Sequence, residues 1–166
     1  ANVVAAKYDV QRLSLGPANA TAMPPGLQAF SPGSSEDTTL TFTNTTGSAA
    51  ADVELSIAVP TTLWTSVVPG TSQTSQRFDS VAPGATVSAT FTVTSGPAAF
   101  NGDLVGTASW TNSTTGARLG ETTTEKVRNV RPIKINEFRA GASDNPTNAF
   151  IELANTRGTA VDISLW

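Results

Sequence analysis

Short segments in which apolar and polar residues alternate one by one recur along the chain, and this pattern limits its fold more than any other feature. In the clearest segment, residues 52–60, large apolar residues occupy every second position: Val53, Leu55, Ile57 and Val59. A period of two places alternate side chains on opposite faces of a β-strand, whereas an amphipathic helix repeats every 3.6 residues. The segment therefore predicts a half-buried strand, which Pro60 ends because proline cannot donate to a strand ladder.

The same alternation predicts further strands. They cover residues 3–13, 38–44, 86–95, 104–111 and 118–130. Segment 118–130 is mostly polar, which is typical of an edge strand protected by charge and hydroxyls. Residues 61–80 are expected to form short or irregular strands anchored by Trp64 and Phe78.

Turn residues separate these segments. The turns are expected at 44–47 (NTTG), 81–84 (VAPG), 101–103 (NGD) and 112–116 (NSTTG), because asparagine, proline and glycine favour turn conformations. Residues 16–33 are rich in proline and glycine and are expected to be a loop. Several short strands and no convincing helix predict an all-β fold, an immunoglobulin-like antiparallel two-sheet sandwich over residues 1–130.

Composition excludes several classes of function. The chain has no cysteine and no histidine, so it lacks a thiolate nucleophile, an imidazole base, a zinc-ligand cluster and a disulfide of its own. Its net charge of -3 gives no basic footprint for nucleic acid. No apolar run reaches the roughly 18 residues of a transmembrane helix, so membrane insertion is not expected. Serine and threonine together make up roughly a quarter of the chain, which favours strands because threonine is β-branched.

A family resemblance covers about residues 32–112. Its features follow in order: the turn 44–47, a strand ending at Pro60, then Trp64, the turn 81–86 and the strand 91–94 (FTVT). This order resembles the NPCBM-associated NEW-type domain of α-galactosidases, although the corner from Pro60 to Trp64 is longer than usual. The resemblance implies a non-catalytic β-sandwich attached to a secreted hydrolase.

The sequence changes character after residue 130. It reads INEF at 135–138, FIELAN at 150–155 and AVDISLW at 160–166. This order resembles the opening of a lamin-tail domain. Residues 131–166 are too few to bury a core of their own, so we expect an N-terminal fragment of a lamin-tail-like β domain in a larger multidomain protein.

The aromatic side chains are the first candidates for a binding site. Tyr8, Trp64 and Trp110 could stack against a sugar ring, as in carbohydrate-binding sandwiches. Tyr8 and Trp110 are in phase with apolar neighbours, and Trp64 matches a core position of the resembled family, so we predict that all three are core residues. Trp166 is expected to mark an interface that lies beyond the fragment.

The acidic residues offer little chemistry. Glycoside hydrolysis needs two carboxyl groups about 5 to 10 Å apart across a cleft. Glu36 and Asp37 are expected on a loop, and Glu137 and Glu152 on strands, so no catalytic residue is assigned. The acids and amides at 144–145 and 101–103 lack the ligand spacing of a calcium loop, and we expect neither a metal nor a cofactor.

Potential glycosylation sites are also present. The acceptor pattern occurs at Asn19, Asn44 and Asn112, which is expected by chance in so threonine-rich a chain.

We therefore expect a non-catalytic accessory or scaffold region of a secreted or cell-surface bacterial protein. Its partners would be the other domains of the parent protein, and a polysaccharide or cell-surface glycan is the other candidate. The alternative is a carbohydrate-binding module that uses exposed aromatics or residues 61–80. An enzyme of unknown type is the weakest hypothesis.

Overall fold

The structure, a computed structural model, describes residues 12–18, 27–131, 133–141, 146–155, 160 and 163. Its strands are β1 (Leu13–Pro17), β2 (Leu27–Phe30), β3 (Ser35–Thr43), β4 (Ala50–Ala58), β5 (Thr65–Val67), β6 (Ser75–Val81), β7 (Thr86–Thr94), β8 (Phe100–Asn112), β9 (Arg118–Asn129), β10 (Ile133–Arg139) and β11 (Phe150–Asn155). A short 3₁₀ turn, η1 (Pro146–Asn148), precedes β11. No helix among the described residues is long and apolar enough to span a membrane.

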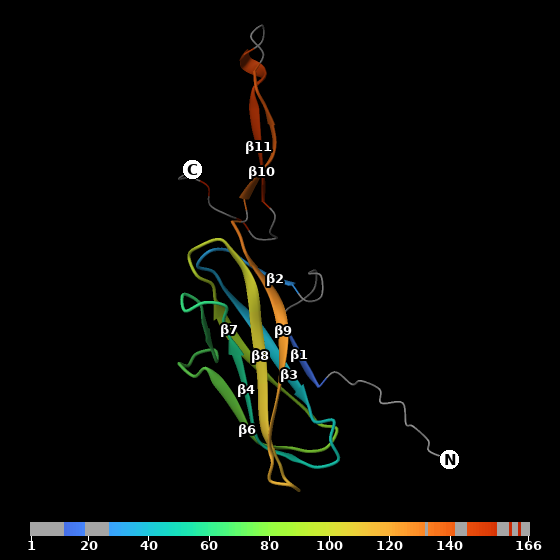
Figure 1. Ribbon diagram of the computed structural model, residues 1–166. Helices are drawn as coiled ribbons and strands as arrows, with labels where there is room; N and C mark the ends of the chain where they lie inside the picture. Colours follow the sequence, from blue (N-terminus) through green and yellow to red (C-terminus); the bar gives the residue numbers. More distant parts are fainter. Residues whose placement is uncertain are drawn as a thin grey trace, which may run out of the picture. The chain divides into compact units, whose positions relative to one another are not determined.

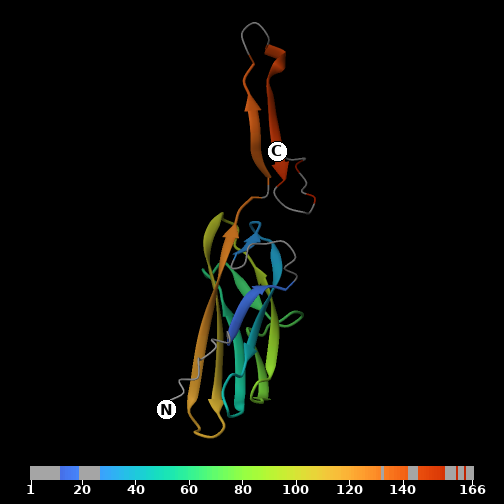
Figure 2. The same cartoon turned by 90° about the vertical axis from the view of Figure 1, so that its right-hand side faces the viewer.

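The strands β1 to β9 form a two-sheet sandwich (Figures 1 and 2). One sheet has the order β1-β3-β7-β5 and the other the order β2-β9-β8-β4-β6. All neighbouring strands are antiparallel except β2 and β9, which run parallel. The predicted all-β, immunoglobulin-like sandwich is thus confirmed, with one parallel pair that local periodicity did not predict.

The inward faces are those that the alternation predicts. Buried side chains from both sheets form the core: Leu40, Phe42, Val53, Leu55, Ile57, Ala89, Phe91, Val93, Leu104, Ala108 and Trp110. Gly106 lies on the same face of β8, and a Cβ atom placed there would come within 2.7 Å of Leu40 Cδ1. Glycine at this position avoids a displacement of the Leu40 side chain, because the two sheets approach each other closely.

Three predicted turns are present. At 44–47, between β3 and β4, the N–H of Thr46 donates to Asn44 Oδ1 at 3.0 Å. The backbone N–H of Ala85 donates to the carbonyl of Ala82 at 3.0 Å, and Gly84 has a φ of 77°. A positive φ at the third residue defines a type II turn, which the Pro83-Gly84 pair favours. Asn112 and Gly116 close the hairpin between β8 and β9, where the N–H of Gly116 donates to the carbonyl of Asn112 at 2.8 Å.

The structure corrects the predicted turn at 101–103. Asn101, Gly102 and Asp103 lie inside β8, paired with β9. A Cβ atom on Gly102 would come within 2.3 Å of the Phe100 ring, so this glycine makes room for packing and does not form a turn.

The predicted loop at 16–33 and strand at 3–13 are also revised. β1 extends to Pro17 and β2 occupies Leu27–Phe30, so the region contributes strands to both sheets. β2 pairs with only the last residues of β9, and a strand that short carries no recognisable alternation. Of the predicted strand 3–13, all but residues 12 and 13 lie outside the described residues.

The polar strand β9 is not an edge strand along its whole length. Its residues Lys126–Asn129 are flanked by β8 on one side and β2 on the other. Within the described chain, residues 118–125 pair only with β8, so the prediction of an edge strand holds for that part alone. The difference arises because pairing with β2 is a long-range contact that the composition of β9 does not reveal.

The chain divides into two compact units, Ala1–Asn129 and Val130–Trp166. The second unit contains a two-stranded antiparallel hairpin of β10 and β11. A β-bulge between Ile135 and Glu137 shifts the register by one residue. As a result Ile135 and Phe138, three positions apart, lie on the same face of the hairpin.

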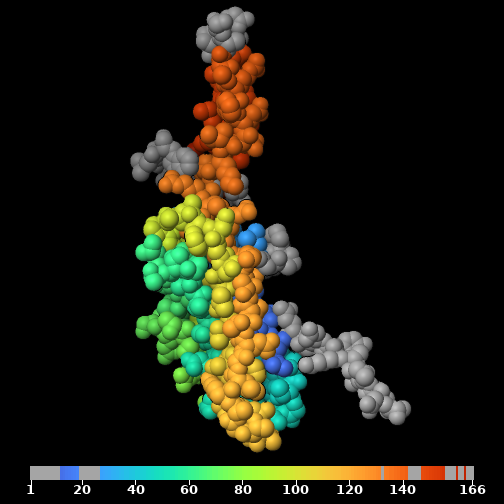
Figure 3. Space-filling view, in the orientation of Figure 1, coloured from blue at the N-terminus to red at the C-terminus, as the bar shows by residue number. Residues whose placement is uncertain are grey.

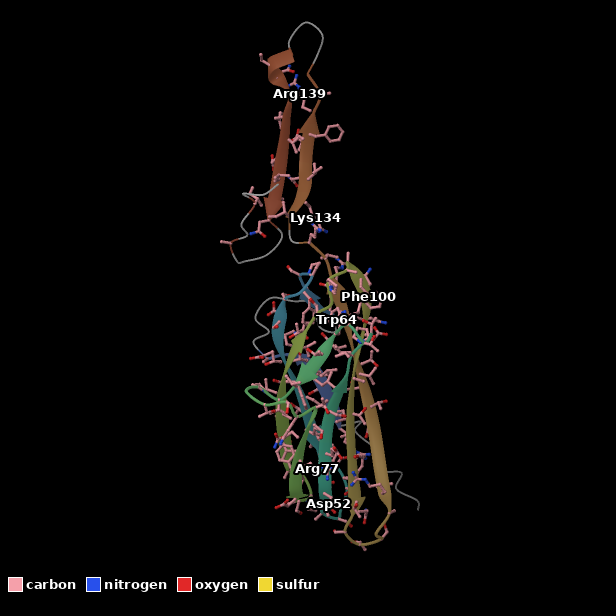
Figure 4. All side chains as sticks on the ribbon, turned by 90° about the vertical axis from the view of Figure 1, so that its left-hand side faces the viewer. Asp52, Trp64, Arg77, Phe100, Lys134 and Arg139 are labelled. Carbon is pink, nitrogen blue, oxygen red and sulfur yellow. The ribbon has the colours of Figure 1, made fainter. Side chains whose placement is uncertain are left out.

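The two faces of this hairpin differ in character. Cross-strand pairing places these residues on one face, here called the apolar face: Ile133, Ile135, Phe138, Ile151 and Leu153. Phe138 is 73% exposed and Ile151 67% exposed. Lys134 and Arg139, labelled in Figure 4, lie on the opposite face together with Glu137, Glu152 and one large apolar residue, Phe150.

Candidate functional site

The tryptophans of the sandwich are core residues. Trp64 is 4% exposed and packs edge-on against Phe30, with ring centroids 5.0 Å apart. Trp110 is 2% exposed, and its ring centroid lies 5.0 Å from that of Phe42. The prediction of burial is confirmed for both residues, so neither ring offers a free face to a sugar. Tyr8 and Trp166 lie outside the described residues.

Arg12 closes the end of the core over Trp110. Its guanidinium carbon lies 5.7 Å from the Trp110 ring centroid, and its Nη1 lies 3.1 Å from Glu121 Oε2. Its Nε donates to Thr45 Oγ1 at 2.9 Å. A cation over an indole face and an ion pair each favour this arrangement. The cluster joins residues distant in sequence and is structural in character.

The structure places Glu36 and Asp37 in β3, not on the predicted loop. Asp37 Oδ1 accepts a hydrogen bond from Thr92 Oγ1 at 2.8 Å across the sheet. This contact belongs to a row of cross-strand pairs between β3 and β7 that also joins Ser35 to Thr94 and Thr39 to Thr90. Asp37 lies on the outer face of β3, where the polar residues meet solvent, whereas Glu36 is half-buried and in phase with the buried residues Thr38 and Leu40.

Glu137 and Glu152 are on strands, as predicted, and face each other across the hairpin of β10 and β11. Asn136 Nδ2 donates to Glu152 Oε1 at 2.5 Å. Within the described residues no three acidic side chains gather as metal ligands. Both carboxylates are exposed on the two-stranded sheet, whereas glycoside hydrolysis needs two carboxyl groups that flank a bound substrate.

One buried carboxyl was missed by the sequence analysis. Glu125 of β9 is 3% exposed and lies on the inward face, between the core positions of Leu104 and Val127. Burial raises the pKa of Glu125 because the ionised form loses its hydration. The sequence analysis did not predict the burial of Glu125, because most residues around it in β9 are polar. The only signal was its position two residues before Val127, which places both side chains on the same face of the strand.

A hollow of about 410 Å³ lies on the outer face of the five-stranded sheet, and we call it the Arg128 hollow. Its lining residues come from β2, β8 and β9: Leu27, Asn101, Gly102, Asp103, Lys126, Val127 and Arg128. Lys126 Nζ lies 2.9 Å from Asp103 Oδ1. Asn101 and Asp103, predicted only as turn residues, thus become part of a charged surface. Asp144 and Asn145 lie outside the described residues.

A second hollow, of about 490 Å³, lies within the predicted region 61–80, and we call it the Ser72 hollow. Residues 72–77 line it, and all of them are polar. Arg77 Nη2 lies 3.1 Å from Glu54 Oε2 at its border. A hydrogen bond from the Ser75 side chain, together with the charge of Arg77, lowers the pKa of Glu54 against the opposite effect of burial.

Of the asparagines that match the glycosylation acceptor pattern, Asn44 and Asn112 lie among the described residues. Asn44 is 1% exposed, and its Nδ2 donates to the carbonyls of Ser48 and Val81 at 2.8 and 2.9 Å. A glycan on this nitrogen is incompatible with the folded structure. Asn112 Oδ1 accepts hydrogen bonds from the N–H groups of Thr114 and Thr115, as expected of a turn residue. Asn19 lies outside the described residues.

A family model matches the central part of the chain. No curated protein matches the chain. Residues 30–113, just over half of its 166 residues, match the family model described as NPCBM-associated, NEW3 domain of alpha-galactosidase. The matched segment begins at the last residue of β2 and ends one residue after β8, so it contains strands of both sheets but neither β1 nor β9. The chain belongs to the NPCBM-associated, NEW3 domain family.

Proposed function

We propose that this chain is a non-catalytic accessory region of a secreted or cell-surface bacterial protein, and that its sandwich acts as a spacer and scaffold for a hydrolase. The observation that carries the proposal is the family match over residues 30–113, which is named for an α-galactosidase domain. The burial of Trp64 and Trp110 supports it, because large aromatic residues here stabilise the core. Its partners are then the other domains of the parent protein.

The test is hydrolysis of a panel of chromogenic glycosides, α-galactosides included, by the purified chain. We expect turnover at the level of buffer alone. The non-catalytic role would be overturned by measurable turnover that is lost on the substitutions Glu137→Gln and Glu152→Gln. Turnover traced to any other acidic residue of this chain would overturn it as well. The pair Asp79→Asn and Asp52→Asn serves as a control for general loss of charge.

For residues 131–166 we propose an N-terminal fragment of a lamin-tail-like β domain. The apolar face of the β10 and β11 hairpin supports this proposal, because a two-stranded sheet with one apolar face needs further structure to cover it. Hydrogen exchange of the 166-residue chain tests it. Rapid exchange of the β10 and β11 amides is expected, and protection equal to that of β8 would overturn the fragment interpretation.

Binding of a carbohydrate is the second candidate function. The Ser72 hollow lies in the region 61–80 and offers hydrogen-bonding groups in place of aromatic rings. A screen of soluble glycans by calorimetry, and of insoluble polysaccharides by depletion, tests this function. Saturable binding would favour it over a passive spacer. Tryptophan quenching is not a suitable readout, since both described tryptophans in the sandwich are buried.

A further inference from the structure

The Arg128 hollow combines charge, polar groups and one apolar side chain on a rigid sheet. Strand register places Lys126 between Leu27 of β2 and Asp103 of β8. The next row places Arg128 between Ala29 and Asn101. Figure 3 shows β2, β9 and β8 side by side at this surface. Its volume, about 410 Å³, falls in the range of about 300–1,000 Å³ that ligand pockets occupy.

The charges of the hollow leave one cation for a ligand. Lys126 Nζ lies 2.9 Å from Asp103 Oδ1, so these two charges neutralise each other. Arg128 projects from the same face of β9 as Lys126, and its neighbours on the adjoining strands, Ala29 and Asn101, carry no charge. The hollow therefore carries a net charge of about +1, which complements a monoanion.

The hydrogen-bonding groups that line the hollow indicate which class of monoanion it can bind. A guanidinium donates two parallel N–H groups that match the two oxygens of a carboxylate. The Asn101 amide can both donate to and accept from a hydroxyl, and Leu27 offers an apolar contact for a sugar ring. A phosphate or sulfate dianion fits less well, because its charge exceeds the single net positive charge of the hollow.

We propose that the Arg128 hollow binds a carboxylated sugar of the hexuronate class, with the carboxylate on Arg128 and a ring hydroxyl on Asn101. The proposal deepens the second candidate function by naming a site and a ligand class, and in that respect it rests on glycan binding. It places the site on β8 and β9, not in region 61–80.

Isothermal titration of the full 166-residue chain with a galacturonate oligosaccharide tests the proposal. The matched neutral galactose oligosaccharide and acetate are the other titrants. We expect the acidic sugar to bind at least tenfold more tightly than the neutral one, and its affinity to fall as salt is added. Acetate distinguishes recognition of the sugar from recognition of a carboxylate alone, and is expected to bind at least tenfold more weakly than the oligosaccharide.

Two arginine variants locate the site. Arg128→Gln is expected to weaken binding of the acidic sugar at least tenfold, because a charge-assisted bidentate pair becomes a neutral contact. Arg118→Gln is the matched control. Arg118 is also an exposed arginine of β9, but it donates to the carbonyl of Asp52 at 3.0 Å and lies outside both hollows. It should leave the affinity within twofold.

The outcomes separate this site from glycan binding in general. Equal affinity of the Arg128→Gln variant and the unsubstituted chain would overturn the site while glycan binding stands. Equal affinity for acidic and neutral sugars would overturn the ligand class. Absence of heat and of chemical-shift change at about 10 mM acidic sugar would overturn this proposal, and binding of the neutral glycan in the same screen then decides whether the second candidate function survives.

Discussion

At the scale of single residues, the inward face of β9 holds a carboxyl group where an apolar residue would pack. Glu125 is buried and burial raises the pKa of its carboxyl. The folded protein thus binds this proton more strongly than the unfolded chain. Protonated Glu125 therefore stabilises the folded state. This contribution is fully present below the pKa of the unfolded chain, about 4.3, and is lost as the pH rises through the higher pKa of the folded protein.

We predict that Glu125→Gln raises the melting temperature at pH 7, by an amount equivalent to about 1 kcal/mol, because the amide has no charge to desolvate. The gain should shrink as the pH is lowered and vanish near pH 4. Thermal melts from pH 3.5 to 8 measure it. Asp79→Asn, an exposed acid on β6, should show no such convergence. A gain that is independent of pH would contradict the assignment of the effect to the Glu125 charge.

Gly106 is a second position at which one atom decides the packing. A Cβ atom there meets Leu40 Cδ1 at 2.7 Å in the closed core, so Gly106→Ala should destabilise the fold by about 1–3 kcal/mol. Gly120→Ala is the control, since its nearest contact would be an ordinary 3.5 Å. Urea unfolding measures both variants. Leu40→Val should recover part of the loss in a double variant, and an additive double loss would refute the steric explanation.

At the scale of strands, β4 contains a bulge that forces an unusual backbone angle. The register between β4 and β8 shifts between Ala51 and Glu54, and Asp52 has a φ of 49°. Arg118 Nη1 donates to the carbonyl of Asp52 at 3.0 Å and holds the bulge. Figure 4 shows Asp52 at the same end of the sandwich as Arg77. Left-handed backbone is tolerated by aspartate but disfavoured for β-branched residues.

We expect Asp52→Val to lower stability by about 1–2 kcal/mol, since valine is strained at this angle, and Asp52→Gly to leave it within about 0.5 kcal/mol. Chemical unfolding of the two variants, with Ala51→Val as the neighbouring control, measures the difference. Equal stability of the glycine and valine variants would show that the angle carries no strain.

Local patterns predicted some elements well and could not predict others. The alternation at 52–60 and 86–95 identified β4 and β7, because each strand buries one face. Residues 101–103 were wrongly predicted to form a turn. Gly102 is explained by packing, because a side chain there would meet the Phe100 ring and Pro60, which is distant in the sequence. The Arg128 hollow had no local signal at all, because register between β2, β8 and β9 creates it.

At the scale of the whole chain, the two units differ in how much apolar surface they bury. The sandwich buries most of its large apolar side chains, although Leu63 is 68% exposed. In the hairpin, by contrast, Ile135, Phe138 and Ile151 each remain more than 60% exposed. Exposed apolar surface of this kind binds hydrophobic dyes and promotes association. The second unit should therefore dominate the dye binding of the folded chain.

We predict that the double variant Phe138→Ser and Ile151→Ser lowers ANS fluorescence by at least half, because it removes the two most exposed large residues of the apolar face. The matched control, Glu137→Ser and Glu152→Ser, alters the opposite face and should leave the fluorescence nearly unchanged. The main melting transition should stay within about 1 °C in both, since the substituted residues lie outside the core of the sandwich. Unchanged dye binding, or a large fall in the main transition for the first variant alone, would show that the apolar face is covered in solution.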